Sequence, residues 1–183
     1  HRMRDEALFK QPPPNEDCPI CMLPLPPLHT GSKYKSCCGK MICSGCIYAV
    51  VKRDGGVGLC PFCRTPTPDP EELIEQLKKR MEVGDASAIY NLGCYYFHGQ
   101  HGLPQDHAKA LELWHRAAEL GNADAYYSIG DAYYSGKGVE FNMEKARHYW
   151  ELGAIRGDVK ARYNLGCDEG NLGNYDRALR HWM

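Results

Sequence analysis

A chain of 183 residues has room for one large or two small domains, and with 43% hydrophobic and 25% charged residues it has an ordinary globular composition. This composition weighs against disorder along the whole chain. A mean hydropathy of −0.53, without an apolar run near the length of about 20 residues that spans a bilayer, excludes a transmembrane helix. The net charge of −1 gives no general attraction to nucleic acid or to an anionic membrane.

The charge is divided unevenly along the chain. Residues 1–68 carry nine Lys/Arg against five Asp/Glu, a balance of +4, whereas residues 69–183 carry thirteen against eighteen, a balance of −5. A balance of +4 over this length is modest, and few aromatic residues lie between the scattered lysines. We therefore do not expect a nucleic-acid partner.

Residues 1–17 are predicted to be an N-terminal linker, because three consecutive prolines at Pro12–Pro14 impose extended polyproline geometry. No secretory signal opens the chain, since His1–Lys10 has charges of both signs and no apolar centre. We expect an intracellular protein of the cytoplasm or nucleus with reduced thiols. Because the chain stops at Met183 within a repeat pattern, we also expect it to be a fragment with further repeats in the parent protein.

Eight of the ten cysteines gather in one stretch, as CPIC, CCGKMICSGC and CPFC. A C-x-x-C pair lets two thiolates on one tight turn reach the same tetrahedral zinc ion. Eight such ligands make two four-coordinate sites, so we expect two zinc ions as cofactors. The predicted ligands are Cys18, Cys21, Cys37, Cys38, Cys43, Cys46, Cys60 and Cys63.

Short elements are predicted between these cysteines. A small hairpin is expected around Lys33–Lys35 and Lys40–Cys43, and a helix over Ser44–Arg53 follows from the apolar spacing of Ile47, Val50 and Val51. The stretch Thr65–Pro70, reading TPTPDP, is a stiff connector. It ends in an N-cap aspartate and a proline, which predict a helix over about 70–83.

An internal repeat emerges when the rest of the chain is aligned on itself. The blocks GDASAIYNLG (84–93), GNADAYYSIG (121–130) and GDVKARYNLG (157–166) superpose at offsets of 37 and 36 residues. Each unit reads as two helices, expected over about 86–97 and 106–120, 123–135 and 142–156, and 159–169 and 174–182. The mid-helix glycines Gly93, Gly130 and Gly166 favour close helix approach.

These blocks, with Lys/Arg-Ala followed by tryptophan in each unit, resemble the Sel-one-like repeat family, which is related to the tetratricopeptide repeats. The resemblance implies stacked helical pairs that share a core and offer an extended surface to a protein partner. Tyrosines of this region are candidates to line that surface. The third unit departs from the pattern, because Glu169 stands at the tyrosine position and the loop between its helices is short.

The cysteine spacing C-x2-C-x15-C-C-x4-C-x2-C-x13-C-x2-C resembles the RING finger family. The resemblance implies a cross-brace in which the first and third pairs hold one zinc ion and the second and fourth pairs the other. One site would take Cys18, Cys21, Cys43 and Cys46, and the second Cys37, Cys38, Cys60 and Cys63. Lys40 stands where most members have histidine, so the all-cysteine variant is the closer match.

Two alternatives stay open within this resemblance. The adjacent Cys37 and Cys38 can bind one zinc ion only if the backbone is kinked between them, and His29 could replace one of the two. The cysteines would also suit a different structural zinc module, such as a double ribbon or a PHD-like finger.

The resemblance implies a ubiquitin ligase that binds a ubiquitin-loaded conjugating enzyme through apolar residues. The matching residues here are Ile20, Ile47, Val50, Pro61 and Phe62. Val50 stands where many members have tryptophan, so its contact would be smaller, and Ile47 could instead pack inward. Arg64 matches the arginine that bridges ubiquitin and the conjugating enzyme in active members.

We therefore predict a small zinc-stabilised α+β RING domain over 18–64, a connector over 65–70, and an all-α helical-repeat solenoid over 71–183. Its units are expected at about 84–120, 121–156 and 157–183. The expected function is that of a RING-type ubiquitin ligase that acts as a scaffold and holds a protein substrate on its repeats. The alternative is a non-catalytic interaction scaffold with a purely structural zinc finger.

Overall fold

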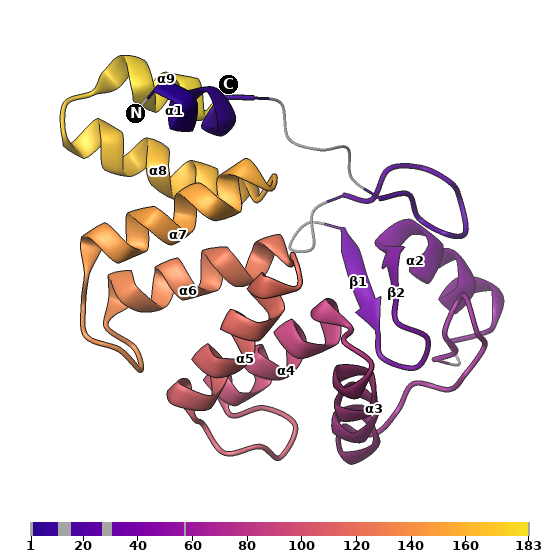
Figure 1. The fold of residues 1–183 in the computed structure, drawn as a ribbon. Coiled ribbons are helices and arrows are strands. Elements are labelled where there is room, and N and C mark those ends of the chain that lie inside the picture. Colours follow the sequence, from indigo (N-terminus) through magenta and orange to yellow (C-terminus); the bar gives the residue numbers. More distant parts are fainter. Residues whose placement is uncertain (1, 11–15, 27–30, 57, 183) are drawn as a thin grey trace.

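The computed structural model describes residues 2–10, 16–26, 31–56 and 58–182. A small cysteine-rich module lies beside one end of a curved stack of helices (Figure 1). The prolines at Pro12–Pro14 and the alternative ligand His29 lie outside the described residues.

The small module contains a two-stranded antiparallel sheet of β1 (Ser32–Lys35) and β2 (Lys40–Cys43), followed by α2 (Ser44–Arg53). The register pairs Ser32 with Cys43 and Lys35 with Lys40, so that a tight turn joins the strands. The predicted hairpin and helix are confirmed. The apolar centre is small, since its buried residues are Cys18, Leu25, Ile42 and Cys60. A module with so little core needs another source of stability, such as bound metal.

Helix α3 (Pro70–Glu82) links this module to the repeats. The Asp69 carboxylate caps it by accepting a hydrogen bond of 2.9 Å from the backbone N–H of Glu72, as the sequence predicts. Ile74 and Leu77 are buried, and Ile74 belongs to the core of the first repeat. The solenoid core therefore begins in α3.

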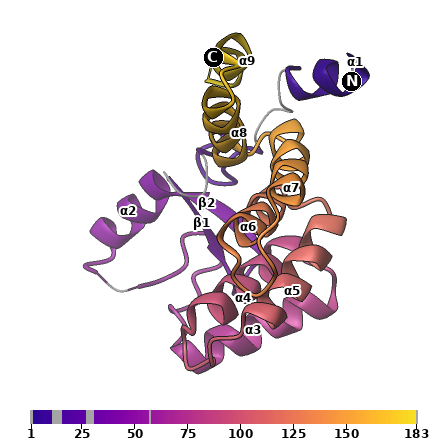
Figure 2. The same cartoon turned by 90° about the vertical axis from the view of Figure 1, so that its left-hand side faces the viewer.

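Six further helices form three antiparallel pairs that stack along a curve (Figures 1 and 2). They are α4 (Ala86–His98) with α5 (His107–Glu119), α6 (Ala123–Ser135) with α7 (Met143–Ile155), and α8 (Val159–Asn171) with α9 (Tyr175–Trp182). The first helix of each pair is capped by Asp85, Asn122 or Asp158. The predicted helical pairs are confirmed, with boundaries that differ by one or two residues.

The repeated spacing of glycine and tryptophan explains how the helices of a pair approach each other. A methyl group at Gly93 would lie 2.7 Å from the indole carbon Cδ1 of Trp114, and one at Gly130 would lie 2.5 Å from Cδ1 of Trp150. Gly166 and Trp182 repeat the arrangement in the third pair. The glycines thus leave the space that each indole fills, and the predicted close approach is confirmed.

The N-terminal segment differs from the linker expected over residues 1–17. It contains a helix, α1 (Arg2–Leu8), which packs over α7 near α9 (Figures 1 and 2). The Leu8 side chain is 1% exposed and belongs to the apolar cluster of Trp150 and Leu165. A helix of this length is unstable in isolation, so contacts with the distant repeat stabilise it.

Candidate metal centres

The first cysteine group brings together Cys18, Cys21, Cys43 and Cys46, whose sulfur atoms all lie within 4.8 Å of one another. The Sγ atoms of Cys18 and Cys46 are 3.9 Å apart, and those of Cys21 and Cys43 are 3.8 Å apart. The grouping joins the first and third cysteine pairs of the sequence, as expected for a cross-brace.

A tight turn and a helix start position these four sulfur atoms. The Cys18 N–H donates a 2.8 Å hydrogen bond to the Leu23 carbonyl, and the Met22 N–H donates one of 2.9 Å to the Cys18 carbonyl. Met22 takes a left-handed conformation with φ of +56°, which closes the turn. Cys43 is the N-cap of α2, and its sulfur accepts a 3.4 Å hydrogen bond from the Cys46 N–H.

The second group contains Cys37, Cys38, Cys60 and Cys63 and obeys the same limit of 4.8 Å between sulfur atoms. The Sγ atoms of Cys38 and Cys60 are 3.8 Å apart, and those of Cys37 and Cys63 are 3.4 Å apart. This group joins the second and fourth cysteine pairs.

The turn between β1 and β2 supplies the kink that two adjacent cysteine ligands need. The Gly39 N–H donates a 2.8 Å hydrogen bond to the Lys35 carbonyl, and Gly39 has a φ of +68°. Such a conformation suits glycine, because it has no Cβ. Cys37 and Cys38 therefore both turn toward Cys60 and Cys63, and the described thiols complete a four-ligand set.

The CPFC turn repeats the geometry of the CPIC turn. The Cys60 N–H donates to the Thr65 carbonyl over 2.7 Å, and the Arg64 N–H donates to the Cys60 carbonyl over 2.9 Å. Arg64 has a φ of +62°, so it occupies the place that Met22 has in the first turn. Neither left-handed residue could be predicted from its type, since both are normally found at negative φ.

The sulfur spacing fits a tetrahedral metal. A zinc–sulfur bond of about 2.3 Å in tetrahedral geometry separates neighbouring sulfur atoms by about 3.8 Å, which is close to the observed distances. Thiolates are soft ligands that favour zinc over hard cations such as magnesium or calcium. Each group can therefore hold one metal ion, and four protein ligands leave no open coordination position.

The surroundings of the thiols affect their ionisation unequally. Burial resists ionisation of Cys18, but the backbone N–H groups of Cys21, Cys43 and Ile20 outweigh it and lower the Cys18 pKa to about 6. Burial and the neighbouring thiols raise the pKa of Cys46 well above its usual value. A bound cation would favour the thiolate form throughout the group, so metal binding and proton release are linked.

The predicted contact residues differ in exposure. Ile20 and Phe62 are 40% and 46% exposed, and both lie on the cysteine turns. Pro61 and Ile47 are half-buried, and Ile47 packs against the cysteine cluster. Val50 is only 9% exposed, so neighbouring residues cover most of its side chain. We therefore remove Val50 from the candidate contact surface.

Sequence reasoning missed other exposed apolar residues beside these turns. Tyr48 and Val51 are three residues apart on α2, so they share one of its faces, and both are exposed. Met22 and Leu23 are also exposed directly after the first turn. The spacing of three positions on the predicted helix was the signal that could have identified the α2 pair.

Arg64 forms an ion pair with Asp54, with 2.8 Å between Nη2 and Oδ2. Asp54 is the C-cap residue of α2 and also pairs with Arg53. Arg53 has the largest effect on the pKa of the Asp54 carboxyl and lowers it. Arg64 lowers this pKa further, whereas burial acts in the opposite direction. The pair connects the second cysteine turn to the end of α2, a link that the sequence did not indicate.

A polar interface joins the module to the repeats. Arg80 of α3 donates hydrogen bonds to the carbonyl oxygens of Ser36 and Cys37. The Tyr34 hydroxyl donates a 2.6 Å hydrogen bond to the Asp85 carboxylate, which caps α4. The second cysteine group and the first repeat are thus attached to each other.

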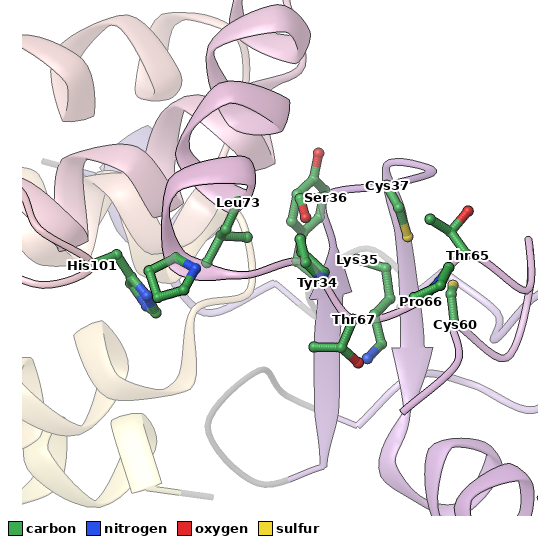
Figure 3. A pocket seen from close by; sticks show the side chains of 12 residues that line it. Tyr34, Lys35, Ser36, Cys37, Cys60, Thr65, Pro66, Thr67, Leu73 and His101 are labelled. Atoms are coloured by element: carbon green, nitrogen blue, oxygen red, sulfur yellow. The ribbon is translucent and has the colours of Figure 1, made fainter. Parts of the chain in front are cut away.

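A cavity of about 260 Å³ lies along this interface. Figure 3 shows connector residues Thr65–Thr67 beside Cys37 and Cys60, with Leu73 and His101 on the side of the helices. The predicted connector therefore forms part of the cavity wall.

The repeat tyrosines mainly serve packing. Among the candidates, Tyr134 is exposed, whereas Tyr95, Tyr96, Tyr126, Tyr127 and Tyr133 are half-buried. The rings of Tyr133 and Tyr149 stack at 5.7 Å between centroids, which joins α6 to α7. Cys94 and Cys167 belong to neither metal group among the described residues.

Within the part of the chain that the structure describes, the helices are too short or too polar to cross a bilayer.

Two known proteins that are similar to this chain have ubiquitin-ligase names. The chain is 36% identical over 99 residues to the "ERAD-associated E3 ubiquitin-protein ligase component HRD3B" of Arabidopsis thaliana, covering 54% of this chain and 15% of that protein. It is 30% identical over 110 residues to the "E3 ubiquitin-protein ligase RNF182" of Ailuropoda melanoleuca, covering 58% and 42%. The chain thus spans less than half the length of either relative.

A Sel1 repeat protein from Oxalobacter formigenes has a similar solved structure, with a TM-score of 0.59 and 27% identity over 76% of this chain and 55% of that one. The family model described as "Sel1 repeat" matches residues 86–122, 123–158 and 159–182. These matches cover more than half of the sequence and coincide with the three helical pairs. The chain belongs to the Sel1 repeat family.

Proposed function

We propose that the chain is a zinc-binding RING-type ubiquitin ligase. The supporting observation is the interleaved pairing of the cysteines, in which the first pair groups with the third and the second with the fourth. In a simple zinc ribbon, the cysteines of two hairpin-like turns bind one metal ion. When the cysteine pairs alternate between two metal ions, both ions stabilise a single compact module. Two relatives carry ubiquitin-ligase names, which supports the same proposal.

The proposed surface for a ubiquitin-loaded conjugating enzyme is formed by the two metal-binding turns. Ile20 and Phe62 expose apolar side chains there, with Pro61 and Ile47 half-buried beside them. Exposed apolar side chains on rigid turns suit a partner interface, because few degrees of freedom are lost when they bind.

Arg64 is the proposed residue that orients the ubiquitin thioester. Its guanidinium offers several donors in one plane, and the Asp54 pair holds the side chain at the end of α2. The chain would act by placing the two reactants in a productive pose, without a covalent intermediate of its own.

The repeats are proposed to hold the protein substrate or another protein partner. Stacked helical pairs present a continuous surface to which each unit contributes side chains. In this proposal residues 18–64 form the ligase module, 65–70 the connector and 71–183 the substrate-binding solenoid. Reduced, metal-bound thiols would place the protein inside the cell, in the cytoplasm or nucleus.

Ubiquitin discharge from a panel of loaded conjugating enzymes tests this function. Ile20→Ala should weaken conjugating-enzyme binding, and Arg64→Ala should slow discharge while binding is retained. Leu120→Ala removes an exposed apolar side chain at the end of α5 and serves as the matched control. Discharge that is equal in all three variants and the unmodified chain would contradict the proposal.

A non-catalytic interaction scaffold is the second candidate function. Burial of Val50 favours it, because a contact position of the resembled family is then missing from the surface. A chain that holds two zinc ions but binds no conjugating enzyme of the panel would support this candidate.

A further inference from the structure

The N-terminal helix α1 occupies an apolar site formed by the second and third repeats. Leu8 is 1% exposed and lies in the cluster that includes Trp150 of α7 and Leu165 of α8. The cluster also contains three small alanines, Ala146, Ala154 and Ala161, all 0% exposed. Leu8 therefore packs in a cluster of one tryptophan, one leucine and small alanine side chains.

Polar contacts fix the orientation of α1. One guanidinium nitrogen of Arg177, on α9, donates hydrogen bonds of 3.1 and 3.0 Å to the two carboxylate oxygens of Asp5. The Nε of Arg177 donates a third, of 3.1 Å, to Glu169 of α8. Arg177 therefore connects α1, α8 and α9, and Glu169 holds the guanidinium in place for Asp5.

Phe9, directly after α1, adds an aromatic contact. The Arg180 guanidinium carbon lies 3.8 Å from the centre of the Phe9 ring, and the His181 ring lies 4.7 Å from it. A cation on the face of an aromatic ring is a favourable contact. The last turn of α1 and the residue after it thus present Asp5, Leu8 and Phe9 to a single surface.

Two charged residues of this surface are positions at which the third repeat departs from the other two. Glu169 stands where the earlier repeats have Tyr96 and Tyr133. Arg177 stands where they have Lys109 and Lys145, of which Lys109 pairs with Glu112 of its own helix. The two changes are coupled, because Glu169 and Arg177 bind each other and Arg177 binds Asp5.

We propose that the face formed by α7, α8 and α9 is a recognition site for a short amphipathic helix. The helix it fits presents an acidic residue followed three and four positions later by two large apolar residues, and α1 fills the site within the same chain. A partner protein with a helix of this pattern would compete with α1. Arg177 and Arg180 supply the complementary charge, and burial of Leu8 in the apolar cluster sets the register.

The experiment uses the full chain carrying Leu8→Asp and Phe9→Ser, so that α1 cannot fill its own site. A fluorescein-labelled peptide of residues 1–10 is titrated, and binding is followed by fluorescence anisotropy. The peptide should bind this variant and bind the unmodified chain at least about tenfold more weakly, because an intramolecular segment has a high effective concentration.

Further variants test the recognition pattern. Adding Arg177→Lys, which restores the residue type of the other repeats, should weaken peptide binding about tenfold, because lysine cannot form the same fork. Lys109→Ala, at the equivalent position of the first repeat, should leave peptide binding unchanged. Peptides with Asp5→Asn or Leu8→Ala should each bind more weakly.

A second measurement tests the proposal even if the doubly substituted chain misfolds. Hydrogen exchange in the chain with Asp5→Asn alone should show faster exchange of the α1 amides than in the unmodified chain, with α4 and α5 unchanged. Equal peptide binding to the filled and emptied sites would overturn the proposal. So would α1 amides that exchange at unprotected rates in the unmodified chain.

Discussion

Arg80 donates a 3.1 Å hydrogen bond to the carbonyl oxygen of Cys37, a predicted metal ligand. A second donor nitrogen of the same side chain binds the carbonyl of Ser36. Helix α3, the first helix of the solenoid, therefore holds the turn that carries Cys37 and Cys38, two members of the second cysteine group. Metal binding and docking of the repeats are expected to support each other.

Arg80→Lys tests this attachment. Lysine cannot reach both carbonyls with a planar fork, so the free energy of unfolding should fall by about 1–3 kcal/mol. Urea unfolding measures the change, and faster hydrogen exchange over residues 36–39 should accompany it. Arg116→Lys is the matched control, because the exposed Arg116 donates to the carbonyl of Met81 elsewhere on α3. An equally large fall in the free energy of unfolding of Arg116→Lys would show that the hydrogen bonds to the cysteine turn contribute no more than the one to Met81.

Gly93→Ala tests the fit between glycine and tryptophan in the first repeat. The added methyl group would lie 2.7 Å from the Trp114 indole and 3.2 Å from the Ala110 carbonyl, so we expect a destabilisation of about 1–3 kcal/mol. Gly170→Ala in α8 provides the contrast, since its methyl group would meet Ala178 at 4.0 Å. Thermal unfolding should show Gly170→Ala to be neutral or stabilising, because alanine favours helix. Equal losses would refute the steric explanation.

Metal content tests the two cysteine groups. The purified chain should contain two zinc ions by mass spectrometry under native conditions or by elemental analysis. Cys43→Ser should remove the ion of the first group, and Cys60→Ser that of the second. Cys94→Ser, outside both groups, should retain two ions. Two ions retained in either ligand variant would contradict the predicted grouping.

Removal of the metal should affect the two parts of the chain differently. The small module has few buried apolar residues, so a chelator should unfold it, whereas the repeats have their own core. Far-UV circular dichroism should then lose little helix, while hydrogen exchange over residues 16–26 and 31–56 becomes fast. Retained protection in the module after complete metal loss would contradict this expectation.

Acid should weaken the third repeat through His181. Burial first, and then the nearby Arg162 charge, lower the His181 pKa to about 4, well below its ordinary value. The charged groups near it are Arg162, Glu169, Arg177 and Arg180. Because the unfolded state takes up the proton first, this contribution to stability is complete above about pH 6.5 and is lost as the pH falls toward 4.

His181→Phe removes this titration while keeping a ring against Phe9. Unfolding of the variant, followed between pH 4 and pH 7, should depend less on pH than unfolding of the unmodified chain. Other carboxylates and thiols titrate in both proteins, so the difference between the two curves isolates His181. Curves that are parallel over this range would show that the proton binds His181 without a stability cost.

The helices of the solenoid could be predicted because their signals are local. Aspartate or asparagine caps precede α4, α6 and α8. Because the same signal occurs in all three units, each unit supports the boundary predicted in the other two. The cysteine groups could be predicted only through a family resemblance. Spacing alone shows that Cys18 and Cys21 share a metal, but it does not show that Cys43 and Cys46 complete the set.

Other features could not be predicted because they depend on residues far apart in the sequence. The contact of Asp5 with Arg177 spans 172 positions, and nothing near Asp5 indicates its partner. A segment judged by its own composition was therefore interpreted as a linker. The ion pair of Arg64 with Asp54 and the contact of Arg80 with Cys37 are likewise visible only after folding.

The docking of α1 on the second and third repeats has a consequence for how this protein can change during evolution. Solenoids normally gain or lose units freely, because each unit touches only its neighbours. Here the small module is attached to the first repeat, while α1, which precedes it in the chain, is attached to the second and third. An inserted unit between them would draw these two anchor points apart, and a deleted one would misplace them. Duplication of a repeat would thus be tolerated outside this span and selected against within it.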